Sequence, residues 1–170
     1  RFPLSASSRA VLLARASELE RPIERAVAWQ SLQEEMFDRT FPPRMLLEAA
    51  LRALPAEPDE LVAQQLAGLI RGTYWRWLDD STRRAVAPEV ERVLWTTLER
   101  APTAGRKGSL FGTIIGVTLT DDGLARLERI AAGLDLVVQT MQQSPHAAWR
   151  LSAAVRDDAI ELAPELVFRE

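Results

Sequence analysis

Apolar residues recur at intervals of three and four positions along almost the whole chain, and this spacing constrains the fold more than any other feature. A helix has 3.6 residues per turn, so residues at these intervals lie on one face that needs to be buried. Segments rich in proline, glycine and aspartate, such as FPPR, PAEPDE and APTAG, interrupt the pattern. We therefore predict an all-α fold of eight or nine helices joined by short loops.

The periodic segments and their end signals predict the individual helices. Pro88 should kink or split the fifth of them, and residues 134–143 fit an extended segment. Expected N-caps are Ser81, Thr120 or Asp121, and Ser144, and Gly133 is expected at a helix C-terminus. The expected helices span about residues 8–19, 22–37, 43–54, 59–78, 82–100, 109–119 and 121–134, with another from residue 145. The buried face of the second is expected to carry Ile23, Ala26, Val27, Trp29, Leu32 and Met36.

The stretch GRKGSLFGTIIG, residues 105–116, resembles a phosphate-binding loop in composition but not in order. A Walker loop places its lysine after the last glycine and follows a strand, whereas Lys107 precedes Gly108 and follows a helix end. The apolar residues from Leu110 onward fit a buried core helix, with a buried strand as the alternative. Gly112 and Gly116, four positions apart, would let a neighbouring helix approach closely.

Length and charge limit the class of protein. The 170 residues are enough for one domain over residues 1–170, with 47% hydrophobic and 26% charged residues. A net charge of -3 gives no electrostatic reason to bind nucleic acid. No apolar run approaches the roughly 20 residues that span a bilayer, so we expect no membrane span. The sequence assigns no compartment, and a soluble cytoplasmic protein is the slightly favoured expectation.

Residues for zinc or triad catalysis are scarce. His146 is the only histidine and cysteine is absent, whereas a catalytic zinc ion needs two or three imidazole or thiolate ligands. Neither H-E-x-x-H nor the nucleophile elbow G-x-S-x-G occurs. We therefore expect no catalytic, cofactor-binding or metal-binding residue in this chain, and no cofactor.

Three aspartate pairs resemble the D-D-x-x-D motif with which helical isoprenoid enzymes bind magnesium. Only the last pair has an acidic residue at the fifth position, and no second motif accompanies it. Turn and capping roles explain the first two pairs. The pairs and their fifth positions are Asp79–Asp80 with Arg83, Asp121–Asp122 with Ala125, and Asp157–Asp158 with Glu161.

An aromatic cluster, Tyr74, Trp75 and Trp77, occupies nearly consecutive helix positions, so its rings cannot all face one way. We expect it to pack on both sides of a layered helical array, and a patch for a peptide or partner domain is the alternative. Arginines near it form either a solvated face or a grip for a carboxylate. They include Arg71, Arg76, Arg83 and Arg84.

Helices of alternating direction with short loops form pairs of about 35 to 40 residues. Such pairs predict an armadillo-like or HEAT-like stack, a right-handed superhelix of antiparallel helix pairs. Five segments also resemble a known family. They are ERPIERAVAWQSLQEEM, LLEAALRALPAEPDELVAQQLAGLI, RGTYWRWLDDSTRRAVAPEVERVLWTTLERA, GRKGSLFGTIIGVTLTDDGLARLERIAAGL and AAWRLSAAV. Over about residues 8–156 the chain resembles the C-terminal helical domain of zinc aminopeptidases of the aminopeptidase N group.

This resemblance implies a non-catalytic domain of a longer multidomain peptidase. Its zinc would lie in a catalytic domain of the same polypeptide, and its helices would form a wall of the substrate chamber and the interdomain contacts. Inner-face arginines would contact the peptide substrate. A free-standing helical-repeat scaffold that binds a protein or peptide is the alternative, and a magnesium-dependent isoprenoid-type enzyme is a third hypothesis.

Overall fold

A computed structural model describes residues 4–143, with side chains through residue 135. Over this range the chain forms α-helices and short 3-10 helices and contains no strand, so the all-α prediction is confirmed there. The elements are α1 (Ala6–Arg15), η1 (Ala16–Glu18), α2 (Pro22–Phe37), α3 (Pro43–Ala53), η2 (Leu54–Ala56), α4 (Glu60–Arg76), α5 (Asp80–Glu99), α6 (Ala104–Val117) and α7 (Asp121–Gln143). The expected helix from residue 145, with its cap Ser144, lies outside the described residues.

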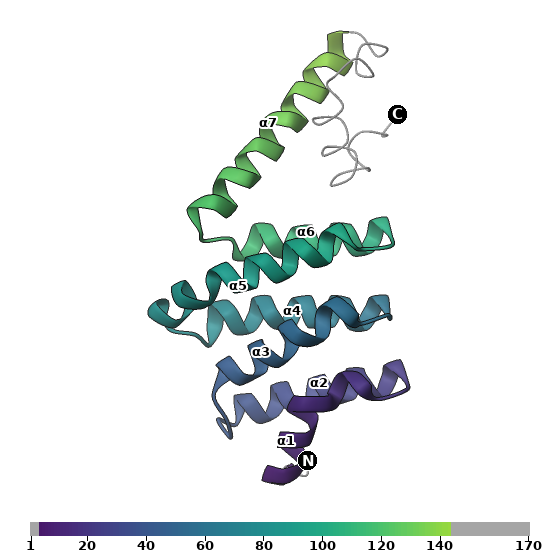
Figure 1. Ribbon diagram of the computed structural model, residues 1–170, viewed down its shortest axis with the longest axis vertical. Helices are drawn as coiled ribbons and strands as arrows, with labels where there is room; N and C mark the ends of the chain where they lie inside the picture. Colours follow the sequence, from purple (N-terminus) through teal and green to yellow (C-terminus); the bar gives the residue numbers. More distant parts are fainter. Residues whose placement is uncertain (1–3, 144–170) are drawn as a thin grey trace.

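The helices form two layers. Figure 1 shows α1, α3 and α5 in front and α2, α4 and α6 behind, while α7 leaves one end of the stack. The contacts agree, because α4 packs against α2, α3 and α6, and α6 also packs against α5. The turns α2–α3, α4–α5 and α6–α7 lie along one edge, and the connections α1–α2, α3–α4 and α5–α6 lie along the other. A right-handed HEAT-like superhelix stays a prediction.

The core lies between the two layers. Leu66 and Ile70 of α4 are fully buried, and every helix from α2 to α6 contributes such side chains. Burying one of them stabilises the fold by about 1.5–3 kcal/mol. That gain outweighs the poor intrinsic propensity of α6, which buries Leu110, Ile114 and Val117.

Capping side chains define several helix starts. The Asp79 carboxylate accepts the N–H of Thr82 at 2.9 Å, so Asp79 caps α5 and the prediction of Ser81 was wrong. Ser81 instead donates its hydroxyl to Asp79. The hydroxyl of Thr120 accepts the N–H of Gly123 at 3.0 Å, which confirms Thr120 as the cap of α7.

The predicted split at Pro88 and the predicted helix end at Gly133 are wrong, and a kink at Pro88 stays a prediction. α5 runs unbroken through Pro88, which is exposed, so the carbonyl that loses its helical partner can face water. Gly133 lies inside α7 and does not end a helix, and residues 134–143 are helical. An interior glycine costs only about 1 kcal/mol, too little to stop a long helix by itself.

The buried face of α2 differs from the expected one. Ile23 and Val27 are 65% and 53% exposed, while Arg25 and Glu35 are buried. Trp29, Leu32 and Met36 are buried as expected. The prediction of a close approach at the two glycines of α6 holds at one of them. Gly116 is approached closely by the side chain of Arg71, but a Cβ on Gly112 would meet nothing within 4 Å.

Candidate functional site

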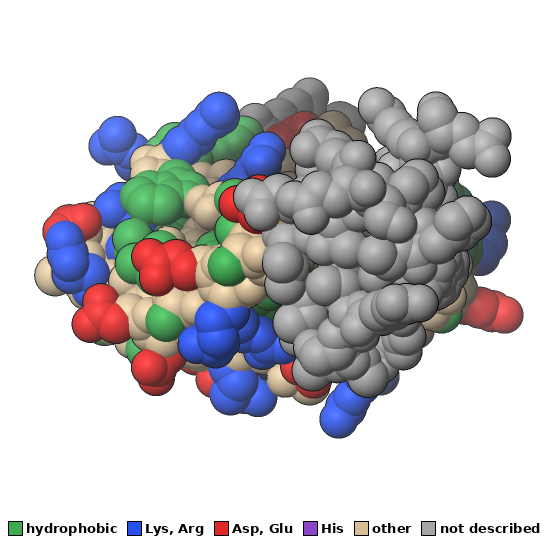
Figure 2. Space-filling view, turned by 90° about the horizontal axis from the view of Figure 1, so that it is seen from above, with side chains coloured by type: hydrophobic (Ala, Val, Ile, Leu, Met, Phe, Trp, Pro, Cys, Tyr) green, Lys and Arg blue, Asp and Glu red, His purple; other side chains and the backbone are tan. Residues whose placement is uncertain are grey.

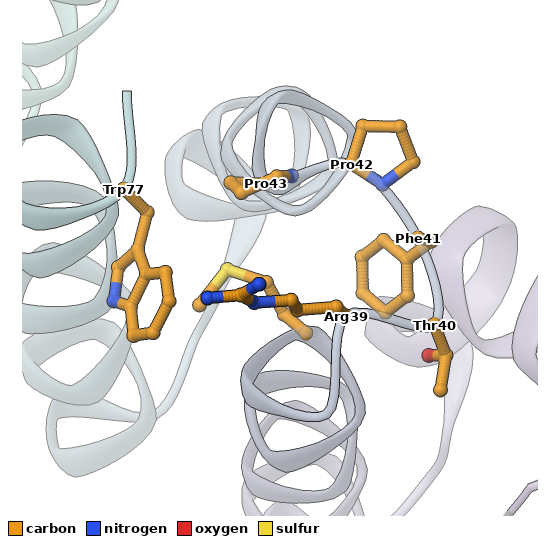
Figure 3. Close-up of a pocket in the computed structure, with 7 residues that line it drawn as sticks. Arg39, Thr40, Phe41, Pro42, Pro43 and Trp77 are labelled. Atoms are coloured by element: carbon orange, nitrogen blue, oxygen red, sulfur yellow. The ribbon is translucent and has the colours of Figure 1, made fainter. Parts of the chain in front are cut away.

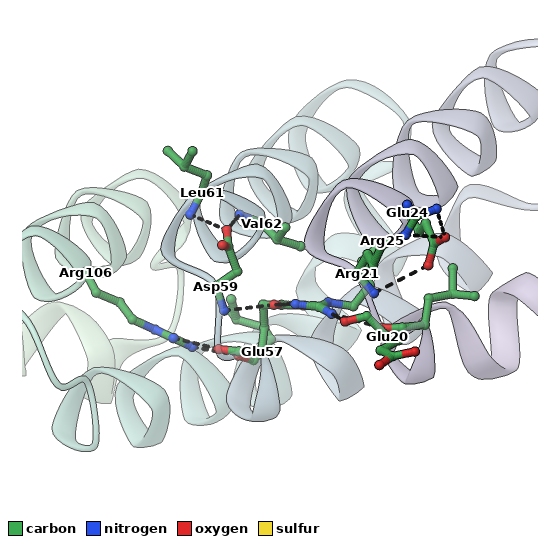
Figure 4. Close-up of polar contacts among 11 residues, drawn as sticks. Glu20, Arg21, Glu24, Arg25, Glu57, Asp59, Leu61, Val62 and Arg106 are labelled. Atoms are coloured by element: carbon green, nitrogen blue, oxygen red, sulfur yellow. Dashed lines mark hydrogen bonds and ion pairs between the residues drawn. The ribbon is translucent and has the colours of Figure 1, made fainter.

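A buried ion-pair network joins two connections, α1–α2 and α3–α4, and the start of α6 along one edge of the stack (Figure 4). Arg25 of α2 donates to the Glu57 carboxylate through Nε at 2.9 Å and Nη2 at 2.8 Å. Its Nη1 donates to the carbonyls of Leu19 and Glu20. Arg106 of α6 donates to the carbonyls of Glu57 and Leu54 at 2.6 and 3.2 Å.

The polar groups of this network are hydrogen-bonded to one another, so few of them remain to bind a ligand or to act in catalysis. Glu57 also accepts the N–H of Asp59 at 2.9 Å, and Arg25, Glu57 and Arg106 are all buried. Both guanidinium groups supply partners to carbonyls at the ends of connections that would otherwise be buried unpaired. We therefore regard the network as structural, because it ties α2 and α6 to the α3–α4 connection.

Along the opposite edge, buried carboxylates likewise bind backbone N–H groups of neighbouring segments. Glu91 of α5 accepts the N–H groups of Leu119 and Thr120 at 2.8 and 2.9 Å, at the turn before α7. Glu35 accepts the N–H of Leu4 at 3.1 Å, and this hydrogen bond is the main reason that its pKa is lowered. Thr40 and Arg9 also donate to this carboxylate. Both carboxylates therefore have backbone partners.

The four arginines near the aromatic cluster have different surroundings. Arg83 donates to the carbonyls of Tyr74 and Leu78 at 3.0 and 2.8 Å, and Arg84 pairs with Asp80. Arg71 and Arg76 are exposed, and no hydrogen bond or ion pair engages either guanidinium among the described residues. Only this second pair remains for a ligand.

The aromatic cluster divides into separate environments, and two of its three rings, Trp75 and Trp77, are exposed, so packing of the whole cluster within the array stays a prediction. Tyr74 is fully buried, which raises its pKa to about 12. Trp75 is 43% exposed and donates its indole N–H to the carbonyl of Gly116 at 2.5 Å. Trp77 stacks on Phe37 with ring centroids 5.2 Å apart. Trp77 thus belongs to a different surface from its neighbours.

A pocket of about 540 Å³ lies beside Trp77, where the α2–α3 turn meets the start of the α4–α5 turn (Figure 3). Its lining is apolar and aromatic apart from Arg39 and Thr40. The lining residues are Met36, Arg39, Thr40, Phe41, Pro42, Pro43 and Trp77. We call this space the Arg39–Trp77 pocket.

Arg39 has a backbone conformation that normally favours glycine. Its φ is 58°, and the N–H groups of Arg39 and Thr40 donate to the carbonyls of Met36 and Glu35 at 2.9 and 3.2 Å. This is the Schellman arrangement, in which glycine is usual at the left-handed position. A side chain there costs roughly 1–2 kcal/mol.

This pocket was not predicted from the sequence. Only FPPR was interpreted, as a helix break, although the longer segment FDRTFPPR has two phenylalanines and two prolines, which are a signal for an apolar turn. The contact with Trp77 joins residues about 40 positions apart and could not be read from spacing.

The aspartate pairs that the structure describes lie at helix starts. Asp79 and Asp80 bind Thr82 and Arg83 respectively, and Asp121 and Asp122 begin α7. Within residues 4–135, no group of three His, Asp or Glu side chains is placed to hold a metal ion. His146, Asp157, Asp158 and Glu161 lie outside the described residues.

A second, apolar groove of about 460 Å³ lies between α1 and α2 at the end of the stack. It takes its lining entirely from α1, the α1–α2 connection and α2, and the exposed Ile23 and Val27 form part of it. The lining residues are Leu12, Leu19, Ile23, Glu24, Val27, Ala28 and Ser31. We call it the α1–α2 groove.

Charge is mixed over the visible described part of the face in Figure 2, where basic and acidic side chains alternate around hydrophobic ones. The described part of this face therefore lacks the broad basic patch typical of nucleic-acid binding. No helix in the described part of the chain is long and apolar enough to cross a membrane.

No family model, curated protein or solved structure matches the chain. The resemblance to aminopeptidase C-terminal domains therefore stays a prediction from the sequence.

Proposed function

We propose that this chain is a non-catalytic helical domain of a zinc-dependent aminopeptidase, forming a wall of the substrate chamber and contacts with the catalytic domain. The all-helical two-layer stack is compatible with that role. The observation that carries the proposal is the α1–α2 groove, whose Ile23 and Val27 are 65% and 53% exposed.

Exposed aliphatic side chains in a groove are typical of a surface that another protein covers. α2 packs against α4 through one side, where Gln65 donates to the carbonyl of Ala26, and no described helix covers the groove beside α1. We assign the groove to the interdomain contact. Arg71 and Arg76, whose guanidinium groups have no hydrogen bond or ion pair among the described residues, are the proposed contacts to peptide substrate.

The complete reading frame tests the proposal directly. A frame that encodes H-E-x-x-H and a downstream glutamate ligand before Arg1 supports it, and a frame without them refutes it. The isolated chain should not hydrolyse aminoacyl-arylamides with or without added zinc. Turnover that survives repurification and chelator washout would refute the non-catalytic role.

Sedimentation equilibrium tests the groove. We expect the isolated chain to self-associate through this surface, and the double substitution Ile23→Gln with Val27→Gln should make it monomeric. Leu61→Gln is the matched control, because Leu61 is 75% exposed on α4 and does not line the groove. If the double variant self-associates as strongly as the native chain, the assignment of the groove to the interdomain contact is refuted.

A free-standing scaffold that binds a peptide is the second candidate function, and the Arg39–Trp77 pocket is the observation that favours it. A start codon close to Arg1 would support this candidate over the first.

A further inference from the structure

We propose that the Arg39–Trp77 pocket binds an internal peptide segment that carries an acidic side chain next to a large apolar one. This inference holds whether the chain is an aminopeptidase domain or a free-standing scaffold. It rests on the shape of the pocket, on the single unpaired charge in its lining, and on the engagement of the backbone groups around it.

The apolar part of the pocket is already formed. Trp77 is 38% exposed, and its indole stacks on Phe37 at 5.2 Å with an interplanar angle of 30°. Besides Trp77, the apolar lining consists of Met36, Phe41 and two prolines. A volume of about 540 Å³ lies in the range of sites that take small organic groups, so an aromatic side chain fits.

Arg39 supplies the charge. It is the one charged residue in the lining, and no hydrogen bond or ion pair engages its guanidinium among the described residues. In Figure 3 its side chain extends across the pocket toward Trp77. A guanidinium is more weakly hydrated than an ammonium group and offers paired donors that match a carboxylate. An acidic side chain on the ligand is the complementary group.

The surrounding backbone favours a side-chain carboxylate over a peptide C-terminus. Terminal carboxylates are commonly captured by a nest of backbone N–H groups. Here the N–H groups of Arg39 and Thr40 are bound to carbonyls of α2, and Pro42 and Pro43 have none. In this turn only the N–H of Phe41 has no partner among the described residues, and a single N–H does not form a nest. The Thr40 hydroxyl donates to Glu35. The guanidinium is therefore the main donor that faces the pocket.

The position of Arg39 also allows a sharp test. Glycine suits the left-handed conformation at residue 39, so Arg39→Gly removes the guanidinium without disturbing the turn. Arg39→Lys keeps the charge but loses the paired donors. Arg100→Ala is the control, because Arg100 is an exposed arginine at the end of α5, on the opposite edge of the stack.

The probe is a seven-residue peptide, amidated at its C-terminus, in the order serine, glycine, glutamate, phenylalanine, proline, glycine, serine. A second peptide replaces the glutamate by glutamine, and a third carries glutamine and a free C-terminal carboxylate directly after the phenylalanine. Each is titrated into the ¹⁵N-labelled chain, and the indole N–H signals of the five tryptophans are followed by NMR. Trp77→Phe assigns the signal of Trp77.

We expect the glutamate peptide to shift the Trp77 signal in a saturable manner, with about tenfold weaker binding to Arg39→Gly and unchanged binding to Arg100→Ala. The glutamine peptide should bind the native chain about tenfold more weakly than the glutamate peptide does. No shift at Trp77, or equal affinity for the native chain and Arg39→Gly, would overturn the proposal. Binding of the third peptide as tight as that of the first would also overturn it, in favour of a terminal carboxylate.

Discussion

Arg25 and Glu57, 32 residues apart in the sequence, form a two-point ion pair whose side chains are 5% and 1% exposed. Neither residue belongs to an apolar periodicity, yet together they fix the α1–α2 connection beside the α3–α4 connection. Their burial makes the pair sensitive to the loss of either partner, because the remaining charge has no water to solvate it.

Glu57→Gln should lower the free energy of unfolding by about 3–5 kcal/mol, because it leaves Arg25 charged and buried without a counterion. Urea unfolding measures the change. In the exposed pair Arg44–Glu48, with side chains 57% and 46% exposed, Arg44→Met should cost less than about 1 kcal/mol. Similar losses at the two sites would contradict the structural role of the network.

The double variant Arg25→Met with Glu57→Leu separates the charge from the contacts. It removes both buried charges, so we expect it to lose less stability than Glu57→Gln alone. A double variant that is the less stable of the two would mean that the backbone carbonyls held by Arg25 carry most of the energy.

Tyr74 should titrate near pH 12 in the folded chain, because burial raises its pKa from the ordinary value of 10.0 and nearby Glu91 acts in the same direction. The chain has a single tyrosine, so tyrosinate absorbance at 295 nm reports this residue alone. We expect a midpoint near 10 in denaturant. A midpoint near 10 in the folded chain would show that the phenol is accessible to water.

The same shift predicts a loss of stability in alkali. Between pH 10 and 12 the folded chain holds the phenolic proton while the unfolded chain releases it, so stability is full below pH 10 and falls toward pH 12. Tyr74→Phe should remove that part of the pH dependence. Its cost at neutral pH should be small, because the hydroxyl has no hydrogen-bond partner in the structure.

Two glycine substitutions should change the stability of the chain in opposite directions. Gly112→Ala should stabilise the chain by about 0.5–1 kcal/mol, because a helical position with open space gains from the lower entropy of the unfolded chain. Gly123→Ala should destabilise it, because the added Cβ would collide with Glu91 and lie 2.7 Å from Cγ2 of Thr118. Thermal unfolding of both variants checks the contrast.

Arg39→Gly should raise the free energy of unfolding by about 0.5–1 kcal/mol, because release of the left-handed strain exceeds the extra entropy that glycine adds to the unfolded chain. Arg39→Ala keeps the strain and should show no such gain. A destabilised Arg39→Gly variant would mean that the arginine side chain contributes packing that outweighs its backbone cost.

Most helices could be predicted from apolar spacing and from the prolines and aspartates between them. Pro43 begins α3 and Thr120 caps α7, because these signals act within one turn. The burial of Arg25 and Glu35 could not be predicted, because their partners include distant residues and connections. Hydrophobic spacing ranks Ile23 above Arg25, whereas the structure buries the arginine.

The candidate sites were less predictable than the fold. The sequence pointed to Tyr74, Trp75 and Trp77 as one cluster, but only Trp77 lines the Arg39–Trp77 pocket. Its partners come from the turn after α2, and a turn's place beside another turn depends on how the two layers stack. Local signals contain no such information.

The buried hydrogen bonds and ion pairs along the two edges make each helix pair specific to its position in the stack. Arg106 of α6 reaches back to carbonyls of Leu54 and Glu57, and Glu57 in turn holds Arg25 of α2. Duplicating or deleting one pair, as is done with interchangeable consensus repeats, would leave a guanidinium or a carboxylate buried opposite the wrong neighbour. The described helix pairs are therefore not interchangeable units.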